Sequence, residues 1–286
     1  CAGDDAGSGD LPMVAAARLG EPGPVRIAAL EAAKPVVSAV PAWHPLVMRL
    51  SGMVCGGDPA VRYEAMEVLD ARAWSQEGVP EAAFLAVLND NDSPFLVTEA
   101  LRLLRYRAKG LADPAPFVAI AKVLATHLDP GIRGRAALLL ARLAPGDPEI
   151  RKLLVSLLDD PHGYTRSAAA EALAFEGAVE AIHALVAHID DQSPNTWDML
   201  PFEHLDGRRE VPHHEGSYFK RVDDAYLRAI EALSVPLGDE AFTYREVNLR
   251  YVNLDIIAAT RDAKKWYAAH VEQIPDDAAP PPPLDE

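Results

Sequence analysis

A short phrase recurs along this chain about once every 35 residues, and it constrains the fold more than any other feature. The phrase joins an aspartate or a serine to a proline, and in most copies an arginine follows a few residues later. The prolines are 35, 36, 31 and 33 residues apart, and they are Pro59, Pro94, Pro130, Pro161 and Pro194. A period in this range is typical of stacked repeat arrays, in which each unit contacts only its neighbours. We therefore expect a long binding surface and not a single deep pocket.

Each copy of the repeat carries two stretches of helical periodicity, separated by a break of Pro, Gly or Asp. After Pro130, apolar side chains recur at steps of three and four residues, so they lie on one face of a helix. We expect the second helix of the Pro94 copy to carry its apolar stripe as far as Leu128, and the first helix of the Pro161 copy as far as Phe175. One helix pair cannot bury such stripes alone. The sequence therefore predicts an all-α fold, an α-solenoid of stacked antiparallel helix pairs with an irregular insertion.

The turns resemble those of the HEAT-like repeat family, particularly its short bacterial form. The resemblance covers about residues 22–190, and it is carried by the Asp-Pro turns, the Val/Ile-Arg after them and alanine-rich helix openings such as residues 135–139. It implies a HEAT/armadillo-like solenoid in which the arginine after each turn joins a polar ladder between neighbouring turns. These arginines are Arg26, Arg62, Arg133 and Arg166. Val97 stands where the Pro94 copy would need its arginine, so the ladder would be interrupted there.

Composition divides the chain into five segments. They are a flexible tether (1–10), the repeat array (11–190), an irregular insertion (191–217), a C-terminal helical capping unit (218–274) and a proline-rich acidic tail (275–286). In the capping unit the apolar spacing predicts three helices, one from about Phe219, one after Asp239 and a last one from about Arg261.

The charge of the chain argues against one class of partner. It has 27 Lys and Arg against 43 Asp and Glu, a formal net charge of −16. Such a surface repels the phosphate backbone, so we expect no nucleic-acid partner. No run of 18 or more apolar residues occurs, so no transmembrane helix is predicted.

The sequence begins with Cys1, followed by small and acidic residues. This start resembles that of a mature bacterial lipoprotein, and the resemblance implies a lipid attached to Cys1 and a flexible tether behind it. In the enterobacterial sorting pattern of such lipoproteins, an aspartate at the second position signals retention in the inner membrane. Ala2 stands there instead and favours the outer membrane, so we expect a lipid anchor in the bacterial cell envelope, on its periplasmic or surface face. A soluble cytosolic scaffold, in which position 1 carries no lipid, is the alternative. Cys55, without a disulfide partner, is expected to be a small buried apolar residue.

Signatures of catalysis are missing from the sequence, including the nucleophile elbow, the phosphate-binding glycine-rich loop and the His-Glu-x-x-His motif. We therefore expect a protein that is not an enzyme and holds no cofactor or metal. The insertion does contain imidazoles and carboxylates, but adjacent His213 and His214 in an extended segment point in opposite directions. An enzyme or a cofactor or metal carrier, with a site under residues 191–217, is retained as the alternative.

These observations favour a lipid-anchored protein-binding scaffold, or an accessory subunit of a bacterial cell-envelope assembly. Its partners would be other proteins, in a larger envelope complex, and the membrane through lipidated Cys1. The side chains expected to meet a partner are the insertion's aromatic and histidine residues and the turn arginines: Trp197, Phe202, His204, His213, His214, Arg62, Arg133 and Arg166.

Overall fold

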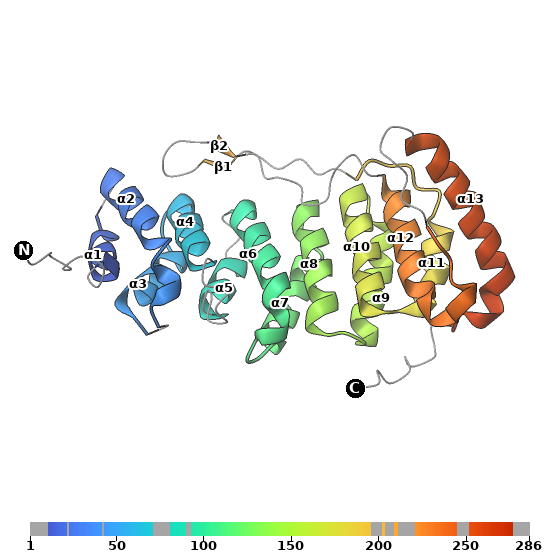
Figure 1. Ribbon diagram of the computed structural model, residues 1–286, viewed down its shortest axis with the longest axis horizontal. Coiled ribbons are helices and arrows are strands. Elements are labelled where there is room, and N and C mark those ends of the chain that lie inside the picture. Colours follow the sequence, from blue (N-terminus) through green and yellow to red (C-terminus); the bar gives the residue numbers. More distant parts are fainter. Residues whose placement is uncertain are drawn as a thin grey trace, which may run out of the picture. The chain divides into compact units, whose positions relative to one another are not determined.

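The computed structural model describes residues 11–21, 23–41, 43–70, 81–89, 93–195, 202–203, 209–210, 221–244 and 252–276. Tertiary contacts divide the chain into two compact units. The first comprises Cys1–Pro116 with Met199–His213, and the second comprises Phe117–Asp198 with His214–Glu286. Figure 1 shows the elements of both, coloured along the sequence.

The first unit is built of helices that pack in two rows. α2, α4 and α6 contact one another in order and form one row, and α1, α3 and α5 form the other. The helices are α1 (Leu11–Arg18), α2 (Pro24–Ala33), α3 (Pro45–Val54), α4 (Pro59–Asp70), α5 (Glu81–Leu88) and α6 (Pro94–Arg107), with short 3-10 turns η1 (Val37–Ala39) and η3 (Ala108–Gly110).

The second unit continues with the same kind of pairing. α10 packs between α8 and α12, and α11 contacts both α12 and α13. The elements are α7 (Ala115–Leu124), which begins at the boundary, α8 (Pro130–Leu143), α9 (Pro148–Ser156), η4 (Leu157–Asp159), α10 (Gly163–Glu176), η5 (Val179–Ala181), α11 (Ile182–Ala187), α12 (Val222–Ser234), η6 (Val235–Glu240), α13 (Val252–His270) and η7 (Val271–Gln273). The expected all-α fold of stacked helix pairs is confirmed.

At Pro59, Pro94 and Pro130 the recurring phrase begins a helix, because the residue before the proline caps it. The Asp129 carboxylate accepts hydrogen bonds from the N–H groups of Gly131 and Ile132, and Ser93 caps α6 in a similar way. Proline at the first helical position loses no hydrogen bond, and its φ already suits a helix. The Pro161 copy differs, since α10 begins at Gly163 and is capped by the ring of His162.

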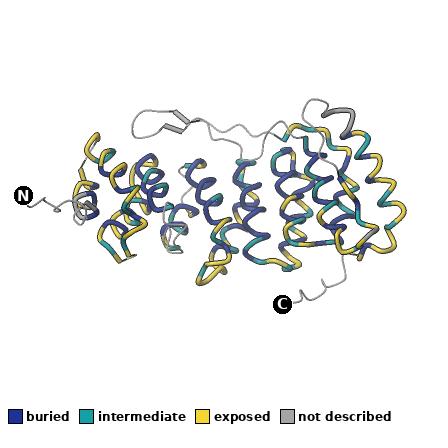
Figure 2. Tube along the Cα trace, in the orientation of Figure 1, coloured by how far each residue is buried: buried dark blue, intermediate teal, exposed yellow. Residues whose placement is uncertain are grey.

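The core of each unit consists mostly of small and branched apolar side chains, with a few aromatic ones such as Phe84 and Tyr226. Figure 2 shows, residue by residue, where the buried positions fall along the helices. Gly134 lets α8 and α10 approach closely. A Cβ on this glycine would lie 2.6 Å from Cε1 of Tyr164 and 3.1 Å from the Cβ of Ala168. The abundance of alanine therefore serves close helix packing, because a larger side chain at such positions would separate the helices.

Three expectations about individual apolar residues were wrong. α7 ends at Leu124, so Leu128 lies beyond the helix and is 95% exposed. Phe175 is exposed at the end of α10, where the Arg142 guanidinium lies 4.2 Å from its ring centroid. Cys55 is also exposed, because it follows Val54, the last buried position of α3, and is rotated away from the core face.

The C-terminal helices differ from the expected pattern. α12 begins at Val222, and the single long helix α13 covers both the stretch around Val252 and the stretch after Arg261, which were expected to be separate helices. α12 packs on α10 as α10 packs on α8, so this pair extends the stack.

The predicted irregular insertion contains a short antiparallel ladder. β1 (Phe202–Glu203) pairs with β2 (Arg209–Glu210), with Phe202 opposite Glu210. At the ends of the insertion, Pro194 forms an antiparallel bridge with Arg221, and the N–H of Val222 donates to the carbonyl of Ser193 at 3.0 Å. The chain therefore enters and leaves this segment at adjacent backbone positions.

Candidate functional site

The turn arginines of the second unit form a continuous polar ladder. Arg133 and Arg166 each stand four residues after a helix cap, so their side chains lie at the start of α8 and α10. At this position a long side chain reaches both the end of the preceding helix and the following turn. These arginines therefore connect neighbouring repeats of the unit.

Arg133 makes four hydrogen bonds that satisfy two kinds of acceptor. Its Nε and Nη2 donate to the two carboxylate oxygens of Asp160, both at 2.7 Å. Its Nη1 donates to the carbonyls of His127 at 2.8 Å and Leu128 at 2.9 Å, just beyond the end of α7. The pair is mostly buried, with side-chain exposures of 13% for Arg133 and 5% for Asp160. A bidentate geometry of this kind is the strongest form of ion pair.

Arg166 repeats this arrangement one turn further along. Its Nε donates to the Asp191 carboxylate at 2.6 Å and its Nη2 to the other oxygen at 3.2 Å. Its Nη1 donates to the backbone carbonyl of Asp160 at 2.5 Å. The Asp160 carboxylate thus accepts from Arg133, and its backbone carbonyl accepts from Arg166. Asp160 therefore connects two consecutive rungs of the ladder.

The ladder sets the protonation of its carboxylates. Burial alone would raise the pKa of Asp160, but hydrogen bonds from Arg133 and from the His162 N–H outweigh it and hold the pKa below its usual value. The same balance, with Arg166 and Ser193 as donors, lowers the pKa of Asp191. Both aspartates are therefore ionised well into the acidic range.

In the first unit each of the two turn arginines donates to a carbonyl at the end of the preceding helix. Nε of Arg62 donates to the carbonyl of Val54 at 3.0 Å, and Nε of Arg26 donates to that of Leu19 at 3.2 Å. Val97 is buried and has no polar group, so the Pro94 copy supplies no rung. The sequence did not identify Asp160 and Asp191 as the ladder's acceptors. Asp160 could have been proposed as an acceptor, because it is the aspartate of an Asp-Pro phrase and so stands in a turn beside the arginines.

The remaining predicted site residues are placed as follows. Phe202 lies in β1, and its backbone is paired there. Cys1, Trp197, His204, His213 and His214 lie outside the described residues. Partner binding by these residues, and by Arg62, Arg133 and Arg166, stays a prediction, although the guanidinium groups of Arg133 and Arg166 are engaged within the protein.

Two exposed apolar side chains of the first unit were not singled out from the sequence. Trp43, just before α3, is 76% exposed, and Met48, in its first turns, is 63% exposed. Between them, His44 uses its ring Nδ1 to accept from the Leu46 N–H and caps the helix. A signal was present, since Trp43 stands two residues before Pro45, a proline that begins a helix. Tryptophan is enriched among the residues that dominate binding energy at protein interfaces, so Trp43 is the candidate contact residue of this surface.

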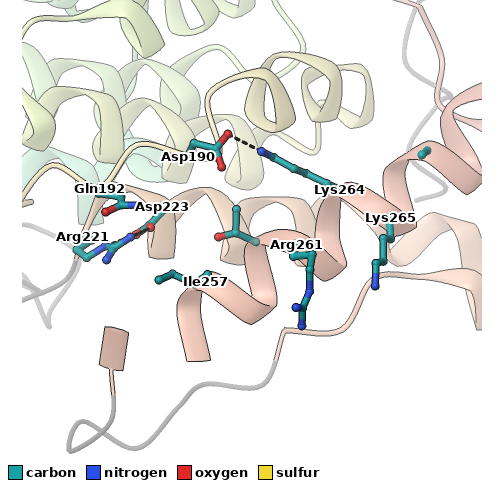
Figure 3. Close-up of a pocket in the computed structure, with 10 residues that line it drawn as sticks. Asp190, Gln192, Arg221, Asp223, Ile257, Arg261, Lys264 and Lys265 are labelled. Atoms are coloured by element: carbon teal, nitrogen blue, oxygen red, sulfur yellow. Dashed lines mark hydrogen bonds and ion pairs between the residues drawn. The ribbon is translucent and has the colours of Figure 1, made fainter. Parts of the chain in front are cut away.

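A hollow of about 480 Å³ lies in the second unit, between the segment after α11, the start of α12 and one face of α13. In Figure 3, Lys264 extends toward Asp190, while Arg261 and Lys265 extend from α13. Lys264 and Asp190 form an ion pair, as do Arg221 and Asp223. The hollow therefore combines paired and unpaired charges with the apolar surface of Ile257 and Ala268.

A buried group of charges lies between α9, α10 and η5. Arg151 pairs with Glu180, and its Nε lies 3.9 Å from a carboxylate oxygen of Glu176. Burial raises the pKa of Glu176 above its usual value, although Arg151 and the Gly146 N–H act in the opposite direction. Two carboxylates thus share one guanidinium.

Within the described ranges, no set of three or more His, Cys, Asp or Glu side chains is arranged to hold a metal ion. The helices found there include none that combines the length and the apolar character needed to span a bilayer.

Comparison with known proteins gives one match to a family. Residues 118–196 match the family described as HEAT repeats. Among the curated proteins there is no match. The solved structures include an engineered protein that was a structural-genomics target, 16% identical, with a TM-score of 0.44 and coverage of 92% of this chain and 98% of that one. The family match and the stacked helix pairs support a HEAT-like repeat protein.

Proposed function

Because residues 118–196 match HEAT repeats and helix pairs stack in both units, we propose that this chain is a protein-binding scaffold. HEAT repeats suggest such a role in general. In the finer form of the proposal, a lipid on Cys1 holds the scaffold to a membrane of the bacterial envelope, where it is an accessory subunit of a larger assembly. The outer membrane is the membrane proposed.

The observation that carries the scaffold role is the contrast between the turns and the surface of the first unit. The ladder arginines of the second unit are bonded to groups of their own chain, so they hold the repeats in place. Trp43 and Met48, in contrast, present apolar surface to solvent. An aromatic side chain on a stable scaffold loses little conformational entropy when it is buried by a partner.

A binding experiment tests this role. The full chain is used to capture proteins from detergent-solubilised envelopes of its source, and a recovered partner is purified and titrated. We expect Trp43→Ala to weaken that affinity by about thirtyfold, since a central aromatic contact contributes about 2 kcal/mol. Leu128→Ala is the matched control, because Leu128 is equally apolar and 95% exposed but lies in the other unit. Equal affinities for wild type and Trp43→Ala would contradict the assignment of this surface.

The insertion can be tested without disturbing the array. Because Pro194 and Arg221 are paired, a short Gly-Ser linker in place of residues 195–220 joins two positions that are already adjacent. We expect this variant to keep its thermal unfolding midpoint and to bind the partner more weakly. A large fall in the midpoint would show that the insertion is structural.

The anchor is proposed from Cys1 and the small acidic residues that follow it. The measurement is the intact mass of the N-terminal peptide from protein purified from its native source. A mass raised by diacylglyceryl and acyl groups on Cys1 supports the anchor. An unmodified Cys1 refutes the anchor and the envelope location, and it leaves the scaffold role to the binding experiment.

A further inference from the structure

The hollow beside α13 concentrates positive charge in a chain that is strongly acidic overall. Its lining includes four cationic side chains, Arg221, Arg261, Lys264 and Lys265, and two acidic ones, Asp190 and Asp223. The lining therefore has a formal charge of +2 (four minus two), against −16 for the whole chain. An anionic ligand would be repelled by most of this surface and attracted here.

The cations of the hollow differ in how far they are already engaged. Arg221 is held by the buried carboxylate of Asp223. Lys264 pairs with Asp190, but both side chains are largely exposed, so this pair is weak and a ligand can replace it. Arg261 lies 3.8 Å from the carboxylate of its neighbour Asp262, and both side chains are exposed, so this pair is weak as well. Lys265 has no ion-pair partner within the part of the chain that the structure describes.

A neutral donor also lines the hollow. Thr260 is only 8% exposed, and its hydroxyl has no hydrogen-bond partner among the described residues. A buried hydroxyl without a partner destabilises the fold, because it loses its hydrogen bonds to water and gains none in return. In helices a threonine hydroxyl often bonds to a carbonyl of the preceding turn, which this one does not. A ligand oxygen in the hollow would satisfy it.

We propose that this hollow binds a phosphate monoester with an apolar organic group. Arg261 and Lys265 supply two positive charges that are not balanced by lining acids, which matches the charge of a phosphate dianion. Lys264 exchanges Asp190 for the ligand, and Thr260 donates its hydroxyl. A phosphate presents three acceptor oxygens and a charge near −2, so it suits several donors better than a single carboxylate does.

The size and the walls of the hollow indicate the organic group. A volume of about 480 Å³ exceeds what a phosphate group fills, and it lies within the range of small-molecule sites. Ile257 and Ala268 supply apolar contacts there, and the methylene stems of the lysines add to them.

The test is a calorimetric titration of the full chain with phenyl phosphate at low ionic strength, near pH 7.5. We expect saturable binding that Lys265→Gln weakens by about tenfold and Thr260→Val by about fivefold. Lys265 is exposed, so its replacement leaves the fold intact. Val has the shape of Thr without the hydroxyl, and a thermal melt checks that this variant folds. Lys122→Gln is the matched control, because Lys122 is an exposed lysine on α7 that forms no ion pair with any other described residue. The affinity of this variant should stay within about twofold of wild type.

Two comparison ligands separate the parts of the proposal. Phenyl phosphate should bind more tightly than inorganic phosphate, which lacks the apolar group, and more tightly than benzoate, which carries a single charge. The proposal is overturned if wild type shows no saturable binding, if Lys122→Gln weakens binding as much as Lys265→Gln, or if benzoate binds as tightly as phenyl phosphate.

Discussion

Breaking the rung between Arg133 and Asp160 should destabilise the second unit strongly. In Arg133→Ala, the Asp160 carboxylate loses two charge-assisted hydrogen bonds and stays in a site where its side chain is 5% exposed. Removing one partner of a buried pair typically costs about 3–5 kcal/mol. The remaining bond from the His162 N–H and the slight exposure of the pair place the expected loss near the lower limit, at about 3 kcal/mol.

A double-mutant cycle measures the interaction energy between Arg133 and Asp160 separately from the other effects of each substitution. Arg133→Ala, Asp160→Ala and the double variant are unfolded in urea and followed by circular dichroism at 222 nm. We expect a coupling free energy of about 2 kcal/mol, since hydrogen bonds to charged groups contribute about 1.5–3 kcal/mol. A loss of 3 kcal/mol lowers the urea midpoint by about 1 M at the denaturant dependence usual for a unit of this size.

The matched control is the exposed pair of Lys152 and Glu149 on α9, where the side chains are 77% and 69% exposed. Its coupling should stay below about 0.5 kcal/mol. Because repeat arrays can unfold in steps, amide hydrogen exchange in α8 and α10 is measured in parallel, and it should report the same ranking. A coupling for Arg133 and Asp160 no larger than that of the control would refute the ladder's structural role.

Further predictions concern packing and pH. Gly134→Ala should destabilise the protein by about 1–2 kcal/mol in urea, because the clash with Tyr164 exceeds the roughly 1 kcal/mol gained in helix propensity; greater stability would show that the helices can move apart. The Asp160 pKa is lowered in the folded state, so its stabilisation is complete above the unfolded pKa and is lost as pH falls through the folded one; Asp160→Asn should flatten the acid side of the urea-midpoint profile. The Glu176 pKa is raised, so the stabilisation by Glu176 is complete below its usual pKa of about 4.5 and is lost as pH rises through the pKa of the folded state. Glu176→Gln should remove this loss of stability with rising pH. Burial alone would lower the pKa of His188, but the Ala184 carbonyl and the Asp159 carboxylate accept hydrogen bonds from its ring and raise the pKa. The stabilisation by His188 is therefore lost as pH rises above the usual histidine range. An NMR titration of the ring measures the pKa, and the pH dependence of the urea midpoint in His188→Gln should lack this loss.

The fold was predictable because its signals are local and repeated. The cap, the proline and the apolar stripe of each copy lie within a few residues, so Asp129 and Pro130 indicate the start of α8 without knowledge of its neighbours. The boundaries were harder. Leu128 continued the apolar period of α7, but α7 ends at Leu124, and exposure depends on what the next repeat covers. The sequence analysis divided the long helix α13 into two helices. No local feature around Val252 indicates that one helix continues through that stretch.

The candidate site was predictable only where residue type determines the partner. The turn arginines followed from the repeat, but their acceptors depend on which loop the stack brings near, and Asp191 is 25 residues from Arg166 in the sequence. The hollow beside α13 gave no sequence signal. Its lining comes from three segments, and Asp190 is 74 residues from Lys264. Pairings at such separation follow from packing, which residue spacing alone does not reveal.

The bridge between Pro194 and Arg221 has a consequence for how this protein can change over evolution. Once the array holds the two ends together, lengthening the intervening segment adds only the slow logarithmic cost of a larger closed loop, about 0.6 kcal/mol for each doubling. The segment can therefore be lengthened, shortened or replaced by a foreign peptide with little loss of stability in the helices. Such a position is suited to rapid sequence divergence and to the grafting of new recognition elements, while the repeats around it stay constant.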